Sequence, residues 1–158
     1  MEEYEVYLAG RIANLSYDEA MSSRNKMVER LNEVGIFCRT PLRGKQHLRD
    51  GSKITGQMLE TCGLSIQEVI QRDLSDLREV DAVVILTGDD PSWGTAGEFY
   101  YATWIANKPT LVIAENYVGG WMEYYATQKV KSFDEAVEVL KRWKEFWNHK
   151  GSGVHSKR

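Results

Sequence analysis

The sequence predicts an α/β protein in which a parallel sheet carries helices on both faces. Short apolar segments typical of buried strands alternate with longer segments whose apolar residues recur at helical spacing. Residues 82–86 form an uninterrupted apolar run, which is typical of a central parallel strand covered on both sides. Alternation of this kind joins neighbouring parallel strands through helices that pack against the sheet.

The first predicted strand and helix open the chain. Residues 6–9 predict a short buried strand. A helix begins after Ser16, because Ser16 and Glu19 form a capping-box pattern, and Gly35 ends it. Arg24 is the one polar residue among the positions that carry the apolar period of this helix.

The second predicted strand is followed by a long segment without a clear period. Residues 36–38 predict the strand, and residues 41–64 contain basic residues and recurring glycines. Loops of this length inside a compact domain are usually functional or mobile. A further helix begins after Ser65, which forms a capping-box pattern with Glu68, and it runs to Glu79.

The rest of the chain continues the alternation of strands and helices. A tight loop at residues 88–94 separates the central strand from a third helix, for which Thr95 and Glu98 form the predicted cap. Residues 110–114 predict another strand, and the final helix begins after Ser132. Between these two elements the chain is aromatic and irregular, with one short strand near its end.

The length and the number of strands favour a single domain. Four or five strands in a chain of 158 residues predict a flavodoxin-like doubly wound parallel sheet with helices on both faces. We assign residues 1–150 to this domain and expect residues 151–158 to be a disordered tail or a cloning remnant. Because such sheets bind ligands beyond the carboxyl ends of their strands, the loops after Ala9, Cys38 and Leu86 should line the site.

Composition excludes several classes of protein. Lysine plus arginine numbers 20 and aspartate plus glutamate 23, so the net charge of −3 gives no general attraction for nucleic acid polymers or anionic membranes. No apolar run is long enough to cross a bilayer, and the acidic N-terminus lacks the pattern of a signal peptide. Cys38 and Cys62 form no metal or redox motif, and the histidines are scattered. We therefore expect a cytoplasmic protein that uses no metal and no other cofactor.

Asp73 lies where an apolar residue is expected. At about 100° per residue, it falls near the centre of the apolar face of the helix that ends at Glu79. Asp76 falls roughly 60° from it, toward the flank, and is expected to be solvated. A buried carboxylate must be stabilised, so Asp73 either caps a loop, pairs with an arginine, or is an acid whose raised pKa lets it donate a proton.

Glu98 follows the central strand at the start of the third helix, near the edge of the sheet where ligands bind. The helix N-terminus favours its ionised form by about 0.3–1 kcal/mol, which suits a nucleophile or a base. Its spacing from Thr95 also fits a plain capping box, and similar boxes elsewhere in the chain suggest no catalysis.

The loop before Glu98 is a candidate anion-binding segment. Backbone amides between Ser92 and Gly94 can bind an anion at the start of a helix, and the Ser92 hydroxyl can add a hydrogen bond. Basic side chains from other loops could meet a phosphate, although each of them also fits a solvated surface position. These basic residues are Arg11, Arg43 and Lys45.

Taken together, these features resemble the nucleoside 2-deoxyribosyltransferase family and its relatives that hydrolyse nucleoside 5'-monophosphates. The resemblance spans roughly residues 4–142, and the ordered combination is more specific than any single segment. It implies a flavodoxin-like fold and cleavage of an N-glycosidic bond. The segments that carry it are Val6-Tyr7-Leu8-Ala9-Gly10, Arg72-Asp73-Leu74 leading to Asp81-Ala82-Val83-Val84, Pro91-Ser92-Trp93-Gly94-Thr95-Ala96-Gly97-Glu98, Tyr101-Ala102 and Lys108-Pro109.

The resemblance implies a catalytic role for three residues. Glu98 matches the family's nucleophile, which attacks C1' of the sugar, and Asp73 matches the acid that assists the departing base. Tyr7 matches the tyrosine that orients the nucleophile, although by itself it also fits an ordinary core position. An ionised carboxylate stabilises an oxocarbenium-like transition state and then bonds to it, while a buried protonated acid helps the base to leave.

Position 92 distinguishes two branches of the resembled family. Six residues before the nucleophile, the transferases carry an aspartate that binds sugar hydroxyls, whereas the monophosphate hydrolases carry a serine that binds the 5'-phosphate. This chain has Ser92, which favours a nucleotide substrate because an aspartate would repel the anion. Asp89 and Asp90 could contact the sugar in its place or repel a phosphate. The predicted substrate-binding set is completed by Gly10, Arg11, Gly94 and Arg43.

We therefore predict an enzyme that cleaves the N-glycosidic bond of a (deoxy)ribonucleoside 5'-monophosphate and releases the base through a glycosyl intermediate on Glu98. Two alternatives stay open: a transferase that exchanges bases between deoxyribonucleosides, and a nucleotide-binding sensor without catalysis. A phospho-receiver domain is disfavoured, because the loop at 11–15 lacks the acidic pair that would hold a divalent metal.

The predicted partners are a small nucleoside or nucleotide and further copies of the chain. The family resemblance implies a homodimer or a larger homo-oligomer. An aromatic cluster near the end of the chain would either stack on a nucleobase or pack against another subunit. Its members are Trp121, Tyr124 and Tyr125.

Overall fold

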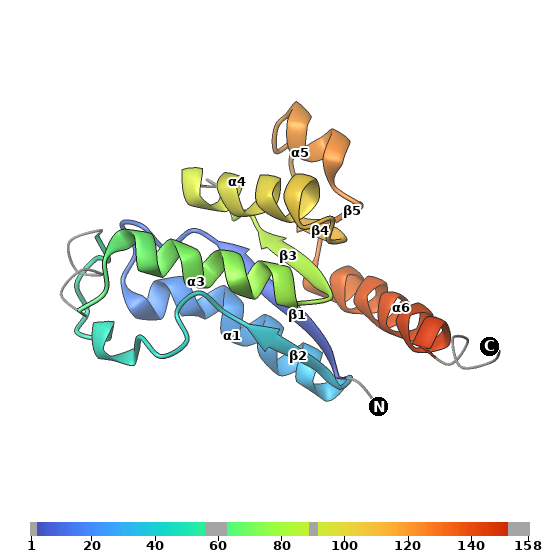
Figure 1. Ribbon diagram of the computed structural model, residues 1–158, viewed down its shortest axis with the longest axis horizontal. Coiled ribbons are helices and arrows are strands. Elements are labelled where there is room, and N and C mark those ends of the chain that lie inside the picture. The colour runs from blue at the N-terminus through green and yellow to red at the C-terminus, as the bar shows by residue number, and fades with distance from the viewer. Residues whose placement is uncertain (1–2, 56–62, 89–91, 152–158) are drawn as a thin grey trace, which may run out of the picture.

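The computed structural model describes residues 3–55, 63–88 and 92–151, and its centre is a sheet of five parallel strands (Figure 1). The strand order is β2-β1-β3-β4-β5. The strands are β1 (Tyr4–Gly10), β2 (Ile36–Arg39), β3 (Ala82–Leu86), β4 (Thr110–Ile113) and β5 (Gln128–Val130). This topology confirms the predicted flavodoxin-like doubly wound α/β fold.

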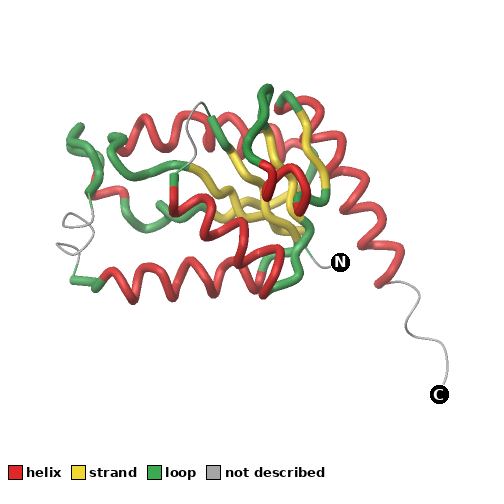
Figure 2. The backbone as a smooth tube through the Cα atoms, turned by 90° about the horizontal axis from the view of Figure 1, so that it is seen from above, coloured by secondary structure: helices red, strands yellow, loops and turns green. Residues whose placement is uncertain are grey.

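Helices cover both faces of the sheet, and Figure 2 shows the strands lying between them. One face packs against α1 and α6, and the other against α3, α4 and α5. The helices are α1 (Tyr17–Glu33), η1 (Gln46–Leu48), α3 (Ile66–Glu79), α4 (Trp93–Tyr100), the π-helical η2 (Tyr101–Ile105), α5 (Gly120–Tyr125) and α6 (Phe133–Gly151). None of these described helices has the length and apolar character needed to span a membrane.

Alternation along β1 decides which residues can reach the ligand-binding layer. Successive side chains of a strand point to opposite faces of its sheet. Leu8 therefore packs in the core beneath α1 and α6, whereas Tyr7 and Ala9 pack in the core shared with α3 and α4. The helices that carry Asp73 and Glu98 thus lie on the Tyr7 side of the sheet.

Two of the predicted helix starts are confirmed in detail. Ser16 begins α1 and Ser65 begins α3, each with a reciprocal capping box to the glutamate three residues later. Gly35, with φ of +69°, follows the end of α1 in the left-handed conformation that glycine adopts without strain.

The predicted cap of the third helix is wrong by one turn. Ser92, not Thr95, caps α4, and its side chain accepts a hydrogen bond from the Thr95 amide at 3.2 Å. Glu98 therefore lies in the second turn of α4, where its carboxylate is not used to cap the helix.

The segment predicted to be irregular contains α5. This helix follows Gly119, whose φ is +105°, and it has no side-chain cap, so the usual sequence signals of a helix start are missing. Of the predicted tail at 151–158, the structure describes Gly151, which ends α6.

Candidate active site

A cavity of about 1300 Å³ lies at the carboxyl ends of β1 and β3. These two strands are neighbours, but the chain leaves them toward opposite edges of the sheet, so the cavity occupies the switch point of the strand order. Its walls include residues from the segments after β1, β2 and β3, as predicted.

Most of the predicted site residues come together at this cavity. Arg43 is not among its lining residues, Tyr7 lies beneath it in β1, and Asp90 lies outside the described residues. The predicted residues that line the cavity are Glu98, Asp73, Ser92, Gly10, Arg11 and Gly94.

Tyr7 and Glu98 form a hydrogen-bonded pair. The Tyr7 hydroxyl donates to Glu98 Oε1 at 2.8 Å. Tyr7 is fully buried, and burial together with the nearby carboxylates raises its pKa well above the usual value, so the phenol stays protonated. The pair therefore fixes one carboxylate oxygen of Glu98 by a neutral donor from the sheet.

Opposing effects set the pKa of Glu98. The net pKa is raised to about 7, chiefly by burial, and the Asp73 carboxylate acts in the same direction. The hydrogen bond from Tyr7 and the positive charges of Arg24 and Lys45 lower it. The ionised form that a nucleophile needs is thus gained as the pH rises through about 7, and burial outweighs the expected influence of the helix N-terminus.

Asp73, on α3, lines the same cavity. Burial raises the pKa of its carboxyl group, against the lowering effects of Lys45 and Arg72. Its Oδ1 atom is buried without a hydrogen bond, and Arg72 Nη2 lies 3.8 Å from it. A buried carboxyl oxygen without a hydrogen bond is unusual in a folded protein and is typical of functional sites. Asp73 and Glu98 thus open onto one cavity, each with a raised pKa.

Asp76 corrects another prediction. It was expected to be solvated, yet it is only 2% exposed, because two arginines from outside its helix cover it. Arg43 Nε donates to Asp76 Oδ2 at 3.2 Å and Arg43 Nη2 donates to Oδ1, while Arg39 Nη1 donates to Oδ1 at 3.3 Å. Arg43 is therefore engaged with α3, not with the cavity where substrate contact was predicted.

Arg24 is a buried residue near Glu98 whose role the sequence did not predict. Its guanidinium group donates to the carbonyl oxygens of Leu8, Gly10, Arg11 and Ala20, which ties α1 to the carboxyl end of β1. It also places a positive charge near Glu98. The only sign of this role in the sequence is that Arg24 interrupts the apolar period of its helix.

Gly10→Ala is expected to destabilise the protein by about 1–3 kcal/mol, because a Cβ atom there would overpack the junction of β1 and Arg24. That atom would lie 3.1 Å from the Leu86 carbonyl oxygen and 3.2 Å from Arg24 Nη2. Thermal unfolding followed by circular dichroism measures the change. Gly97→Ala is the matched control, since nothing lies near its added Cβ and alanine favours helix. Equal melting temperatures for Gly10→Ala and wild type would contradict the prediction.

The start of α4 offers groups that can receive an anion. The first amides of a helix have no partners within it, and Ser92 and Gly94 lie at this end of the cavity wall. Arg11 lines the cavity from the loop that follows β1, where its Nε donates to the Ala13 carbonyl oxygen at 3.2 Å. Lys45, buried at 5% exposure, is a further cation in the lining.

One wall of the cavity is aromatic. Trp121 stacks on Tyr125 with ring centroids 5.7 Å apart, and Trp104 meets the same tyrosine edge-on at 5.1 Å. Trp104 and Trp121 line the cavity, whereas Tyr124 is 80% exposed. Among the described residues, no group of three or more His, Cys, Asp and Glu side chains is arranged to hold a metal ion.

Comparison with known proteins supports the fold. The sequence matches no protein-family model and no curated protein. Among solved structures, it resembles a 2-deoxyribosyltransferase from Bacillus psychrosaccharolyticus with a TM-score of 0.59 and 18% identity over 84% of this chain and 90% of that one. It also resembles a CMP N-glycosidase from Clostridium botulinum, with a TM-score of 0.52 and 15% identity over 86% and 97% of the two chains.

A third solved structure has the same fold. It is a conserved protein from Enterococcus faecalis V583, with a TM-score of 0.59 and 14% identity over 89% of this chain and 99% of that one. At these identities the likeness establishes the flavodoxin-like α/β fold. Two of the three neighbours are enzymes of the deoxyribosyltransferase and N-glycosidase type, the family that the sequence motifs resemble.

Proposed function

We propose that this chain is an N-glycosidase of the nucleoside 2-deoxyribosyltransferase family, which releases the base from a (deoxy)ribonucleoside 5'-monophosphate. The observation that carries the proposal is the pairing of Glu98 with Tyr7 at a cavity that Asp73 also lines. The two structural neighbours that are enzymes of this type support the same class of reaction.

The proposed reaction has two steps. In the first, a Glu98 oxygen bonds to C1' of the sugar, the C1'–N bond breaks, and Asp73 gives its proton to the departing base. In the second, water attacks C1', Asp73 takes a proton from that water, and the bond between C1' and Glu98 breaks. Tyr7 holds the nucleophile in place, because its hydroxyl donates to Glu98 Oε1 and leaves Oε2 for the attack on C1'.

The preference for a nucleotide rests on the groups at the start of α4. The Ser92 hydroxyl and the backbone amides near Gly94 can donate hydrogen bonds to a 5'-phosphate. Arg11 can neutralise part of the phosphate's charge. Gly10 lines the cavity at the end of β1. Asp90 lies outside the described residues, so its contact with the substrate is proposed from the sequence alone.

A product assay tests this function against its two alternatives. The protein is incubated with deoxynucleosides and with deoxynucleoside 5'-monophosphates, with and without a second base, and the products are separated by chromatography. Release of free base and sugar phosphate supports the hydrolase. Base exchange without sugar release would instead support a transferase, and binding without any turnover would support a sensor.

Ser92→Asp is expected to lower kcat/KM for the 5'-monophosphate by about 10–100-fold, because a carboxylate repels the phosphate. Activity on the matching nucleoside, which lacks this charge, should change little. Ser92→Asn is the matched control, since asparagine has the same size without the charge and both replacements can cap α4. Equal losses for both substrates would show that Ser92 does not discriminate by charge.

Activity is expected to rise with pH through about 7 as Glu98 becomes ionised, and Tyr7→Phe is expected to move this rise to higher pH. The phenol stabilises the carboxylate by its hydrogen bond, so its removal makes ionisation harder. The measurement is kcat/KM as a function of pH for both proteins. An unchanged acid limb in the variant would contradict the role given to Tyr7.

A further inference from the structure

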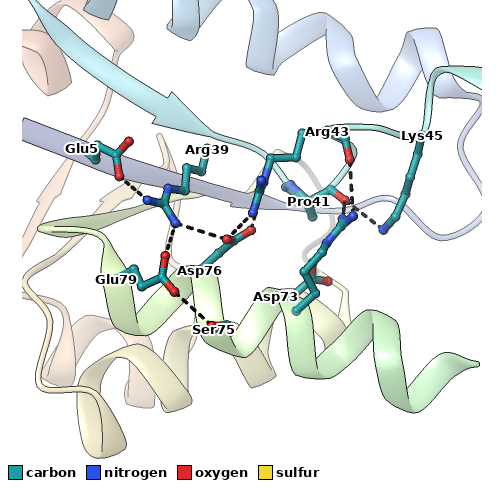
Figure 3. Close-up of polar contacts among 10 residues, drawn as sticks. Glu5, Arg39, Pro41, Arg43, Lys45, Asp73, Ser75, Asp76 and Glu79 are labelled. Carbon is teal, nitrogen blue, oxygen red and sulfur yellow. Dashed lines mark hydrogen bonds and ion pairs between the residues drawn. The ribbon is translucent and has the colours of Figure 1, made fainter. Parts of the chain in front are cut away.

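An ion-pair cluster joins α3 to the segment that follows β2. Figure 3 shows its centre, Asp76, between two arginines. Arg39 also contacts Glu5 and Glu79, each at 2.6 Å, so its position is fixed from the sheet and from α3 together. The residues of this cluster do not line the cavity, and none of them takes part in the two reaction steps proposed above.

The same cluster anchors the turn that leads to Lys45. Arg43 binds Asp76 directly, and the Pro41 carbonyl oxygen accepts hydrogen bonds from Arg72 Nη2 and from Lys45 Nζ, both at 2.9 Å (Figure 3). The turn is closed by the Lys45 amide, which donates to the Leu42 carbonyl oxygen at 3.0 Å. Residues 40–45 are therefore held on α3 at several points.

Lys45 is the charged residue that this turn brings to the cavity, beside Leu42. Lys45 is 5% exposed and lines the same cavity as Asp73. Its ammonium group is the charged neighbour with the largest lowering effect on the pKa of Asp73, while its effect on Glu98 is smaller than that of Arg24. Asp73 thus has a buried cation close by that does not belong to its own helix.

We propose that Lys45 is a positioning residue for the acid of the reaction: the Asp76 cluster holds its ammonium group near Asp73, where it stabilises the carboxylate left after Asp73 protonates the departing base. The inference rests on the function proposed above and adds a residue to it.

The chemistry explains why such a charge is useful. Burial alone makes Asp73 a weaker acid, because the carboxylate formed by proton transfer would be poorly solvated. A general acid works best when its pKa lies near the working pH. The proton moves from Asp73 to the base nitrogen as the C1'–N bond breaks, and the new negative charge appears on Asp73, where Lys45 can stabilise it.

Other charged groups also act on Asp73. Arg72 comes from its own helix, Asp76 from the next turn of α3, and Arg43 from the anchored turn. Glu98, which lines the same cavity, interacts with Asp73 as a like charge, and Tyr7 is hydrogen-bonded to Glu98. A test must therefore separate the contribution of Lys45 from theirs.

The first test is a carbon-13 NMR titration of the Asp73 carboxyl group, assigned by its loss in Asp73→Asn. In Lys45→Met the titration midpoint is expected to rise by about one pH unit, and Lys45→Arg is expected to keep it near the wild-type value. Lys26→Met, which removes an exposed lysine of α1, is the matched control and should leave it unchanged. An unchanged midpoint in Lys45→Met overturns the proposal.

Asp76→Asn separates the direct and indirect effects, because they have opposite signs. Removing the negative charge of Asp76 would by itself lower the pKa of Asp73, whereas release of Lys45 from its place would raise it. A rise that disappears when the same change is made in Lys45→Met supports the positioning role of the cluster, because the released Arg43 also acts on Asp73. Any other result overturns it. If this variant does not fold, Arg39→Met loosens the same cluster, and Arg39 is not among the groups that act on Asp73.

The kinetic test uses the alkaline limb of the profile of kcat/KM against pH, where activity is lost as Asp73 loses its proton. Lys45→Met should move this limb to higher pH and lower kcat. Lys45→Arg should return the limb and kcat to near their wild-type values. If wild-type protein releases no base at all, the proposed function fails, yet the NMR titration still decides whether Lys45 acts on Asp73. If wild type is active and Lys45→Met is unchanged in both measurements, only the present inference fails.

Discussion

Replacing Glu98 with glutamine is expected to lower base release by about 10³–10⁵-fold, because the amide oxygen cannot form the bond to C1'. Glutamine keeps the size of the side chain and an acceptor for the Tyr7 hydroxyl, so binding of the 5'-monophosphate should be nearly unchanged. Chromatography measures base release, and calorimetry measures binding. Retention of most of the activity would exclude Glu98 as the nucleophile.

The same variant allows a check of the covalent step. Wild-type protein quenched during turnover should carry the mass of a sugar phosphate on the peptide that contains Glu98, and Glu98→Gln should not. A labelled peptide elsewhere in the chain would place the nucleophile on another residue.

Stability provides a readout of Glu98 that does not depend on activity. Its pKa in the folded protein is about 7, above the ordinary value of 4.5, so the folded state holds this proton more tightly than the unfolded state. The wild type therefore loses stability as the pH rises from about 4.5 through 7, and glutamine removes this loss. We expect Glu98→Gln to gain melting temperature relative to wild type at pH 8, with a smaller difference at pH 5.

The fold could be predicted from the sequence because its signals are local. The apolar run of β3 and the capping boxes at Ser16 and Ser65 each depend on residues that are neighbours in the chain. The start of α4 was predicted wrongly because its local signals are ambiguous. Ser92 and Thr95 both carry hydroxyl groups that can cap a helix, and spacing alone could not decide which one does.

The site could be predicted only in part, because several of its partners are distant in sequence. A helical period places Asp73 and Asp76 relative to their own helix, but it cannot reveal that Arg39 and Arg43 fold over Asp76 from more than 30 residues away. The acceptors of Arg24 are backbone carbonyl oxygens, which leave no mark in a sequence. The resemblance to a family supplied the pairing of Tyr7 with Glu98, which periodicity left open.

Replacing Asp73 with asparagine is expected to lower kcat strongly, because this variant lacks the proton that the departing base needs. We expect kcat to fall by about 10²–10⁴-fold for an ordinary deoxynucleoside 5'-monophosphate. Asparagine has nearly the same shape and also relieves the burial of a charge, so the folded structure should be kept.

The leaving group distinguishes a lost acid from a damaged site. An N7-methylated purine carries a positive charge while bound to the sugar and departs as a neutral base, so it needs no proton from Asp73. Asp73→Asn should therefore retain most of the wild-type rate of the first step with such a substrate, measured as the initial burst of base release, because only the second step still needs Asp73 to take a proton from water. Glu98→Gln should lose this burst, because attack at C1' is still required. Comparable losses of Asp73→Asn on both substrates would mean that Asp73 serves binding or structure, and the pairing of a nucleophile with an acid across this cavity would have to be abandoned.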